Sequence, residues 1–158
     1  TLLAELNIRR IRHDPDDPRI ADFTNHIALV NGIAERSAPF VWRYVDDSGN
    51  APATRPYADA LIIVNFSVWD SVQALEHFVW QTVHKHFYGR RDEWFEHFDG
   101  PSYVLWWIPI GHRPTFEEAA ARLEHLKKHG PSEHAFDWAS GSAQLWKTAR
   151  CAPSESAA

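Results

Sequence analysis

Residues 68–88, VWDSVQALEHFVWQTVHKHFY, lead from the apolar end of a strand through a helix N-cap into an amphipathic helix. At about 100° per residue, the core-facing side of this helix consists of Val72, Leu75, Val79 and Val83. A second group lies beside that side, spread over about 60° of the helical wheel, and consists of Trp80, His84, Phe87 and Arg91. The position of His84 leaves two interpretations open. Its imidazole is either half-buried and bonded to a backbone carbonyl, or the base or ligand of a small-molecule pocket.

The composition limits the class of protein. With 158 residues the chain is long enough for one domain with a core and too short for two ordinary ones. We expect a single domain over residues 1–138 and an irregular C-terminal tail over residues 139–158. Eight tryptophans need large buried surfaces, in a pocket, an oligomer interface or both. A net charge of −5 does not suit a phosphate backbone, so nucleic-acid binding is not expected.

Cysteine usage and hydropathy predict the compartment. Cys151 is the one cysteine of the sequence, so no internal disulfide can form and a reducing compartment fits. The sequence shows no signal peptide, and apolar runs such as ALIIV at residues 60–64 are too short to span a membrane. We therefore expect a soluble, cytoplasmic protein that does not bind membranes.

Hydrophobic periodicity predicts four strands and three main helices. The strands are expected over residues 2–11, 40–45, 60–69 and 102–109, and the helices over residues 18–36, 71–88 and 116–129. Asp17 before Pro18 is typical of a helix start. Capping boxes are expected at Asp70 with Gln73 and at Thr115 with Glu118. From Ser132 onward the chain is expected to be short and irregular.

The order of these elements predicts the α+β class. It is β-α-β-β-α-β with one extra C-terminal helix, which is the split βαβ arrangement of ferredoxin-like folds. Two principal helices cover only one face of such a sheet. The other face is also apolar, because alternation places Phe40, Trp42 and Tyr44 on one side of the second strand. We therefore expect a homodimer in which two sheets pack face to face.

Four segments of the sequence are similar to one bacterial family. They are LAELNIRR at residues 3–10, FVWR at 40–43, VNFSVWDSVQALEHFVWQTVHKHFYGRRDEWF at 64–95 and LWWIPIGHRPTFEEAAARLEHLKKHGP at 105–131. Together they resemble the family named domain of unknown function 3291. The resemblance implies a dimeric α/β-barrel fold, shared with antibiotic-biosynthesis monooxygenases, haem-degrading monooxygenases, chlorite dismutases and aldoxime dehydratases. It implies no particular activity.

A wider similarity concerns three residues. Haem-degrading monooxygenases of this superfamily use an asparagine on the first strand, a tryptophan ending the third strand and a histidine on the following helix as axial iron ligand. Asn7, Trp69 and His84 match these residues in type and order. The resemblance thus implies haem as a candidate cofactor with His84 as its ligand. The family's histidine follows the tryptophan about one helical turn later than His84 does, and His86 faces another direction on the helix.

Polar side chains on two strands predict where a pocket lies. On the first strand they are Glu5, Asn7 and Arg9, and on the third strand Asn65 and Ser67 share a side with Trp69. Asn7 and Glu5 are either bonded to neighbouring strands or to Arg9, or Asn7 is a polar anchor of the pocket.

We predict His84 and Asn7 as catalytic residues. The predicted pocket lining consists of Trp69, Trp80, Phe87, Tyr88, Arg91, Asn65 and Ser67. Arg91 is the candidate to bind a substrate carboxylate, because it shares a side of the helix with His84. No zinc site is expected, and no nucleophile elbow or glycine-rich phosphate loop occurs.

Three classes of function remain open. The first is an oxidoreductase of the monooxygenase type, acting on an aromatic or polyketide-like substrate, either without a cofactor or with haem. The second is a lyase, isomerase or dehydratase that uses His84 as general acid and base. The third is a protein that binds a small molecule without catalysis.

Overall fold

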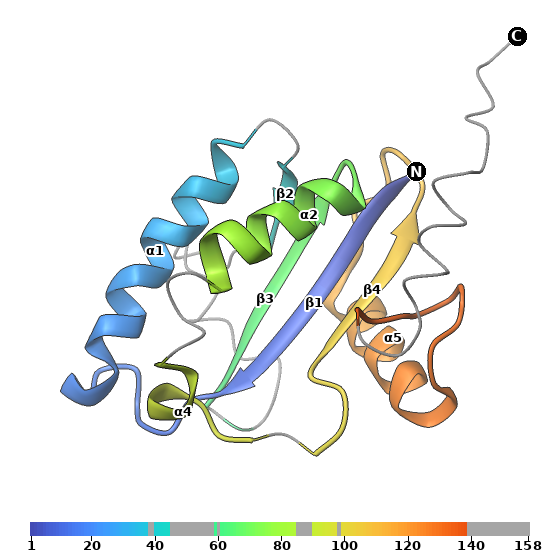
Figure 1. The fold of residues 1–158 in the computed structure, drawn as a ribbon. Helices are drawn as coiled ribbons and strands as arrows, with labels where there is room; N and C mark the ends of the chain where they lie inside the picture. Colours follow the sequence, from blue (N-terminus) through green and yellow to red (C-terminus); the bar gives the residue numbers. More distant parts are fainter. Residues whose placement is uncertain (38–39, 45–58, 60, 85–89, 98, 139–158) are drawn as a thin grey trace, which may run out of the picture.

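The computed structural model describes residues 1–37, 40–44, 59, 61–84, 90–97 and 99–138. Its centre is a four-stranded antiparallel sheet (Figure 1). The strands are β1 (Leu2–Arg10), β2 (Phe40–Arg43), β3 (Ile62–Trp69) and β4 (Tyr103–Ile108). They lie in the order β2-β3-β1-β4, with every neighbouring pair antiparallel. The predicted α+β class is confirmed, and this sheet is compatible with a ferredoxin-like fold.

The helices connect these strands in the predicted order. A 3-10 turn, η1 (Pro18–Ile20), leads into α1 (Ala21–Glu35) between β1 and β2. Between β3 and β4 lie α2 (Val72–Phe78), the π-helix η3 (Val79–His84) and α4 (Arg91–Trp94), and α5 (Phe116–His129) follows β4. None of the helices in the described part of the chain is long and apolar enough to cross a membrane.

Side-chain caps explain where these helices begin and end. Asp17 accepts a hydrogen bond from the Arg19 amide at 2.8 Å, as expected from the Asp-Pro pair. Thr115 caps α5 in the same way, accepting from the Glu118 amide at 3.1 Å. The helix ends at Gly130, whose φ of 72° is a conformation that glycine adopts readily.

The predicted start of α2 is wrong by one residue. The N-cap is Ser71, whose hydroxyl accepts from the Ala74 amide at 3.2 Å, and not Asp70 with Gln73. Ser71 has extended dihedral angles, which direct its short side chain back over the first turn.

The predicted long helix over residues 71–88 is regular only as far as Phe78. From Val79 the chain forms a π-helix, whose i→i+5 hydrogen bonds space side chains differently from an α-helix. The helical wheel therefore fails beyond Phe78. Trp80, which the wheel places at the border of the core, is 58 % exposed. Residues 85–89 lie outside the described residues.

Both faces of the sheet are covered within one chain. On one face, α1 and α2 pack on two apolar groups, which we call the Trp69 cluster and the Trp94 cluster (Figure 1). The Trp69 cluster comprises Leu3, Ala34, Trp69, Val72, Leu75, Leu105 and Phe136. The Trp94 cluster comprises Ile11, Ile20, Phe23, Val30, Ile63 and Trp94.

The expectation that helices cover only one face is wrong. On the second face, α5 contributes Ala119, Leu123 and Leu126 to a single apolar cluster with side chains from β1, β3 and β4. Phe66 and Trp106 at the centre of this cluster are 1 % and 0 % exposed. The extra C-terminal helix therefore buries much of the surface that the sequence assigned to a partner sheet. The homodimer itself stays a prediction.

A register shift changes which side chains of β2 share a face. Phe40 pairs with Trp69, but Trp42 pairs with Val68, so the ladder is irregular at Val41. Phe40 consequently packs against the Trp69 cluster, while Trp42 packs on the opposite face. The prediction that Phe40 and Trp42 share one side is therefore wrong, because the extra residue reverses the alternation.

The segment after α5 is part of the core, although the sequence predicts it to be irregular. The Phe136 carbonyl accepts from the Leu105 amide at 2.8 Å, and the Phe136 amide donates to the Leu105 carbonyl at 2.9 Å. This pairing extends the sheet beyond β4. Ala135 and Phe136 are both 0 % exposed and belong to the clusters on opposite faces.

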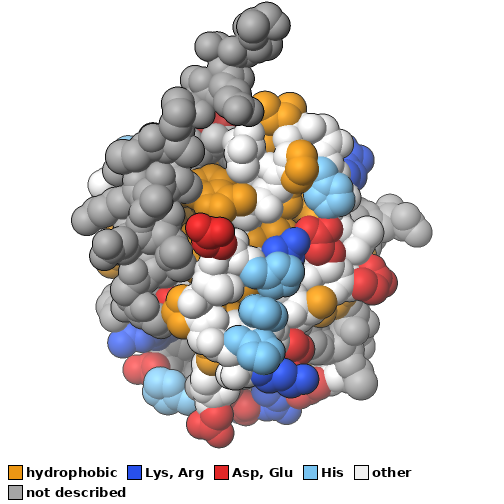
Figure 2. Space-filling model, turned by 90° about the vertical axis from the view of Figure 1, so that its right-hand side faces the viewer, with side chains coloured by type: hydrophobic (Ala, Val, Ile, Leu, Met, Phe, Trp, Pro, Cys, Tyr) orange, Lys and Arg blue, Asp and Glu red, His pale blue; other side chains and the backbone are white. Residues whose placement is uncertain are grey.

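Histidine side chains gather in a column on the surface formed by α5 and this segment (Figure 2). The ring centroids of His129 and His134 each lie 4.6 Å from that of His125. Arg122 donates to both the Nδ1 atom and the carbonyl of His134, at 2.9 and 2.7 Å. The column therefore links the end of α5 to the segment that pairs with β4.

Truncation of Phe136 tests the role of this segment. We expect Phe136→Ala to lower the free energy of unfolding by about 3 to 5 kcal/mol, because it removes a fully buried ring. Ile110→Ala is the control, since Ile110 is 78 % exposed and its loss should change stability by less than about 0.5 kcal/mol. Urea unfolding measures both variants. Equal midpoints for Phe136→Ala and the unmodified chain would contradict the assignment of the segment to the core.

Candidate functional site

Two neighbouring rows of the sheet carry polar side chains on the face covered by α1 and α2. In the first row, Glu5 of β1 lies between Ser67 of β3 and Leu105 of β4. In the second row, Asn7 lies between Asn65 and Tyr103. This polar band separates the Trp69 cluster from the Trp94 cluster. A break in the apolar packing therefore crosses the middle of the sheet.

The first row contains a directed chain of hydrogen bonds. The indole N–H of Trp69 donates to the Ser67 hydroxyl at 2.9 Å, and Ser67 donates to Oε1 of Glu5 at 2.8 Å. Because an indole N–H can only donate, the Ser67 oxygen serves as its acceptor and the Ser67 proton is directed to Glu5. Ser67 is 4 % and Trp69 1 % exposed. Both residues therefore hold the Glu5 carboxyl in one place.

Glu5 has the titration behaviour of a proton donor and acceptor at neutral pH. Burial raises the pKa of its carboxyl from 4.5 to about 7, and the hydrogen bond from Ser67 offsets part of this increase. Near neutrality both the protonated and the ionised form are populated. In the next row, burial also raises the pKa of Tyr103 to about 12, so its hydroxyl stays protonated.

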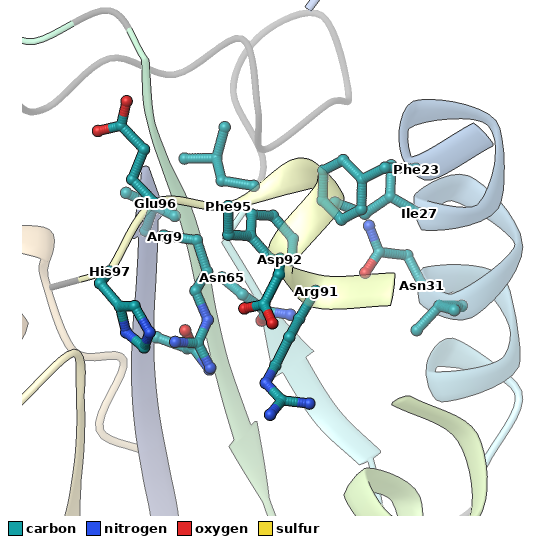
Figure 3. Close-up of a pocket in the computed structure, with 14 residues that line it drawn as sticks. Arg9, Phe23, Ile27, Asn31, Asn65, Arg91, Asp92, Phe95, Glu96 and His97 are labelled. Atoms are coloured by element: carbon teal, nitrogen blue, oxygen red, sulfur yellow. The ribbon is translucent and has the colours of Figure 1, made fainter. Parts of the chain in front are cut away.

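A cleft of about 340 Å³ opens beside the polar band, between the sheet, α1 and the segment that follows α4 (Figure 3). Its apolar wall includes Phe23, Ile27 and Val30 of α1, together with Ile63 and Phe95. Its polar lining includes Asn7, Asn31 and Asn65, the charged side chains of Arg9, Arg91, Asp92 and Glu96, and His97. A cleft that combines an apolar wall with a few converging polar groups is typical of a small-molecule site.

Contacts at the end of β1 fix the segment that closes this cleft. The Arg12 amide donates to the Trp94 carbonyl, and the Glu96 amide to the Arg10 carbonyl, each at 2.8 Å. The rings of Phe23 and Phe95 meet edge to face, with centroids 4.9 Å apart. The wall of the cleft is thus tied both to the sheet and to α1.

The charged side chains at the cleft differ in the partners that they contact. Arg10 forms ion pairs with Asp59 and Glu96, so Glu96 already has a cationic partner. Arg9 donates to the Ser102 hydroxyl at 3.3 Å. Desolvation lowers the pKa of Arg9, and the positive charge of Arg91 lowers it further, which places the two guanidinium groups within electrostatic reach of each other. Arg9 nevertheless stays protonated, as arginines do in proteins.

The structure brings together part of the residue set predicted from the sequence. Asn7, Asn65 and Arg91 all line the cleft. Ser67 and Trp69 do not line it but support Glu5 from within the core. Trp80 lies on the exposed side of η3, outside the cleft lining.

The remaining predicted residues are not tested. Phe87 and Tyr88 lie outside the described residues, and the structure describes only the backbone of His84, at the end of η3. The role of His84 as base or iron ligand therefore stays a prediction.

Sequence reasoning missed other functional candidates. It placed Glu5 beside Asn7 but gave it no chemical role, although an acidic residue on a strand with both faces covered must either pair or change its pKa. It also missed Asn31, because α1 has an otherwise ordinary amphipathic pattern. Arg9 and His97 reach the cleft from segments that are far apart in the sequence, so only the fold shows their proximity.

Comparisons with known proteins give a family but no activity. No curated protein and no solved structure matches this chain. The model of one family, described as Domain of unknown function (DUF3291), matches residues 2–151. This match covers nearly all of the chain and bears out the resemblance seen in its sequence. The protein is a member of the DUF3291 family.

Proposed function

We propose that this protein is an enzyme that binds a small molecule in the cleft and transfers a proton to or from it through Glu5. The reaction class is that of a lyase, isomerase or dehydratase that works without a cofactor. The observation that supports this best is the half-buried Glu5 side chain, whose pKa is raised to about 7. Glu5 does not itself line the cleft, but it lies two residues before Asn7, which does. A general acid or base is most effective when its pKa lies near the working pH.

Neighbouring residues have distinct roles in this proposal. Glu5 and Asn7 are two residues apart on β1, so their side chains leave the same face of the sheet about 7 Å apart. Asn7 positions a polar atom of the substrate in the cleft. Ser67 and Trp69 are positioning residues, because they act on Glu5 and not on the substrate.

An oxidoreductase of the monooxygenase type is the second candidate. Asn7 lines the cleft and Trp69 lies on the same face of the sheet, as the resemblance to haem-degrading monooxygenases implies. However, Trp69 is buried in its own cluster and its indole N–H is bonded to Ser67. The described contacts therefore support acid–base chemistry better. Haem ligation by His84 stays a proposal from the sequence.

A homodimer is part of the proposal. Since α5 occupies much of the second face, a partner would contact the part of that face nearest β2, where Trp42, Tyr44 and Ile62 are only partly buried. We expect light scattering to give twice the monomer mass at micromolar concentration. A monomer mass under the same conditions would contradict this expectation.

A first test of Glu5 is the pH dependence of stability. Between its unfolded pKa of 4.5 and its folded pKa of about 7, the folded state binds more protons than the unfolded state. Stability from this group is therefore full below pH 4.5 and falls as the pH rises toward 7, by up to about 3 kcal/mol. Relative to the unmodified protein, Glu5→Gln should gain stability between pH 5 and 8.

The control for this measurement is Glu133→Gln, which neutralises an exposed glutamate on the C-terminal segment. Chemical unfolding at a series of pH values compares the three proteins. A difference between Glu5→Gln and the unmodified protein that does not change with pH would show that Glu5 titrates normally.

Catalysis is tested by following which compounds the protein converts. A metabolite extract is incubated with the full-length protein, and mass spectrometry identifies the substrate that disappears and the product that forms. Glu5→Gln should slow this conversion by about 100-fold to 10,000-fold, as loss of a general acid or base does. Glu133→Gln should leave the rate unchanged. If Glu5→Gln converts the substrate at the normal rate, Glu5 is not the proton-transfer group; retention of a compound without conversion would instead indicate a binding protein.

A further inference from the structure

Arg9 is a cation at the cleft with no anionic partner in the part of the chain that the structure describes. Its hydrogen bond to the neutral Ser102 hydroxyl, at 3.3 Å, is long. The neighbouring Arg10 and Arg90, in contrast, each form two ion pairs with carboxylates. Arg9 lines the cleft, and Figure 3 shows its guanidinium group and that of Arg91 extending in the same direction. A planar guanidinium binds a carboxylate through two parallel hydrogen bonds.

Asn7 supplies a second, independent feature of the same cleft. Its side-chain oxygen is buried and accepts no hydrogen bond from any described residue. A buried acceptor without a donor costs about 1 to 3 kcal/mol, so it is rare unless a ligand completes it. The missing group is a donor, such as a hydroxyl. Because the Asn7 oxygen has almost no accessible surface, a ligand in the cleft reaches it only with a rotation of the Asn7 side chain. An ammonium group suits the position less well, because Arg9 and Arg91 are both positive.

The spacing of these two residues limits the ligand. Asn7 and Arg9 are two residues apart on β1, so their side chains leave the sheet on the same face about 7 Å apart. A ligand that contacts both residues is therefore expected to carry its donor and its anionic group on different parts of the molecule. Asp92 and Glu96 also line the cleft, and their negative charges disfavour a nucleotide or another multiply charged anion. A single carboxylate fits better than a phosphate ester.

The wall of the cleft fits the body of such a ligand. Phe23 and Phe95 meet at an interplanar angle of 85°, and both line the cleft with Ile27. A flat ring can pack against this apolar wall, which offers few groups to hydrogen-bond a sugar or a polar chain.

We propose that the ligand of this cleft is an aromatic hydroxy acid, whose carboxylate binds Arg9 and whose hydroxyl donates to the Asn7 oxygen. Its ring lies against Phe23 and Phe95. This inference rests on the proposed function in that it uses the same cleft, and it adds the chemical class of the substrate.

Calorimetric titration of the full-length protein tests this class with matched probes. The probes are para-hydroxybenzoate and para-hydroxyphenylpropanoate, their methyl esters, and the two acids without the hydroxyl group. We expect at least one hydroxy acid to bind about tenfold or more tightly than its ester and than its analogue without the hydroxyl.

Two variants assign these preferences to residues. Arg9→Gln should remove the preference for acid over ester, and Asn7→Ala should remove the preference for the hydroxyl group. Arg113→Gln is the matched control, because Arg113 lies 5.4 Å from the Trp42 ring on the opposite face of the sheet. It should leave both preferences unchanged. Circular dichroism of each variant establishes that it is folded.

The outcomes separate this inference from the proposed function. Equal binding of acid and ester, or a preference that persists in Arg9→Gln, would overturn the carboxylate assignment. The inference also fails if no probe binds while Glu5 still governs conversion of another metabolite, in which case the proposed function stands. Conversely, tight binding that depends on Arg9 and Asn7, with turnover unaffected by Glu5→Gln, would support the ligand class and contradict the proposed catalysis.

Discussion

The position of β1 constrains every other part of this protein. The strand pairs with β3 on one edge and β4 on the other, and helices cover the sheet on both faces. Glu5 and Asn7 are therefore half-buried, whereas Arg9 is exposed at the cleft. A polar side chain held inside the sheet needs an internal partner or a change in protonation. Glu5, Asn7 and Arg9 occupy alternate positions on this strand. Glu5 accepts a hydrogen bond from the Ser67 hydroxyl, and the Asn7 oxygen has no donor among the described residues. Arg9 lies in the lining of the cleft.

Packing around the polar band explains why a cleft exists at that point. α2 packs in the Trp69 cluster, while α1 contributes Ala34 to that cluster and Phe23 and Val30 to the Trp94 cluster. The cleft lies beside Phe23 and Val30 and is not filled by side chains. Filling it would bury Asn7 and Asn65 against apolar side chains, at a cost in free energy that hydrogen bonds would have to offset. The same groups that prevent close packing thus become available to a ligand.

Much of the fold follows from local sequence patterns. The four strands, the Asp17 and Thr115 caps and the glycine at the end of α5 all depend on neighbouring residues, and each was predictable. The features that were missed depend on distant contacts. Neither the bulge at Val41 nor the pairing of Phe136 with Leu105 has a distinctive local sequence pattern. Residues 79–84 form a π-helix although their amphipathic pattern predicts a regular α-helix. For the site, alternation along β1 and β3 indicated Asn7 and Asn65, whereas the raised pKa of Glu5 depends on burial that only the tertiary structure determines.

The histidine column at the edge of the sheet contributes stability that changes with pH in the opposite direction to the stability contributed by Glu5 at its centre. Arg122 donates to Nδ1 of His134, so this nitrogen must be unprotonated for the contact to form. Desolvation, and then the charges of Arg122 and His125, lower the pKa of His134 below its ordinary value of 6.5. Stability from this contact is therefore present above pH 6.5 and is lost as the pH falls toward the lower folded pKa. Mild acid thus weakens this contact while it favours the protonated carboxyl within β1, so an edge and the interior of the same sheet respond to pH in opposite directions.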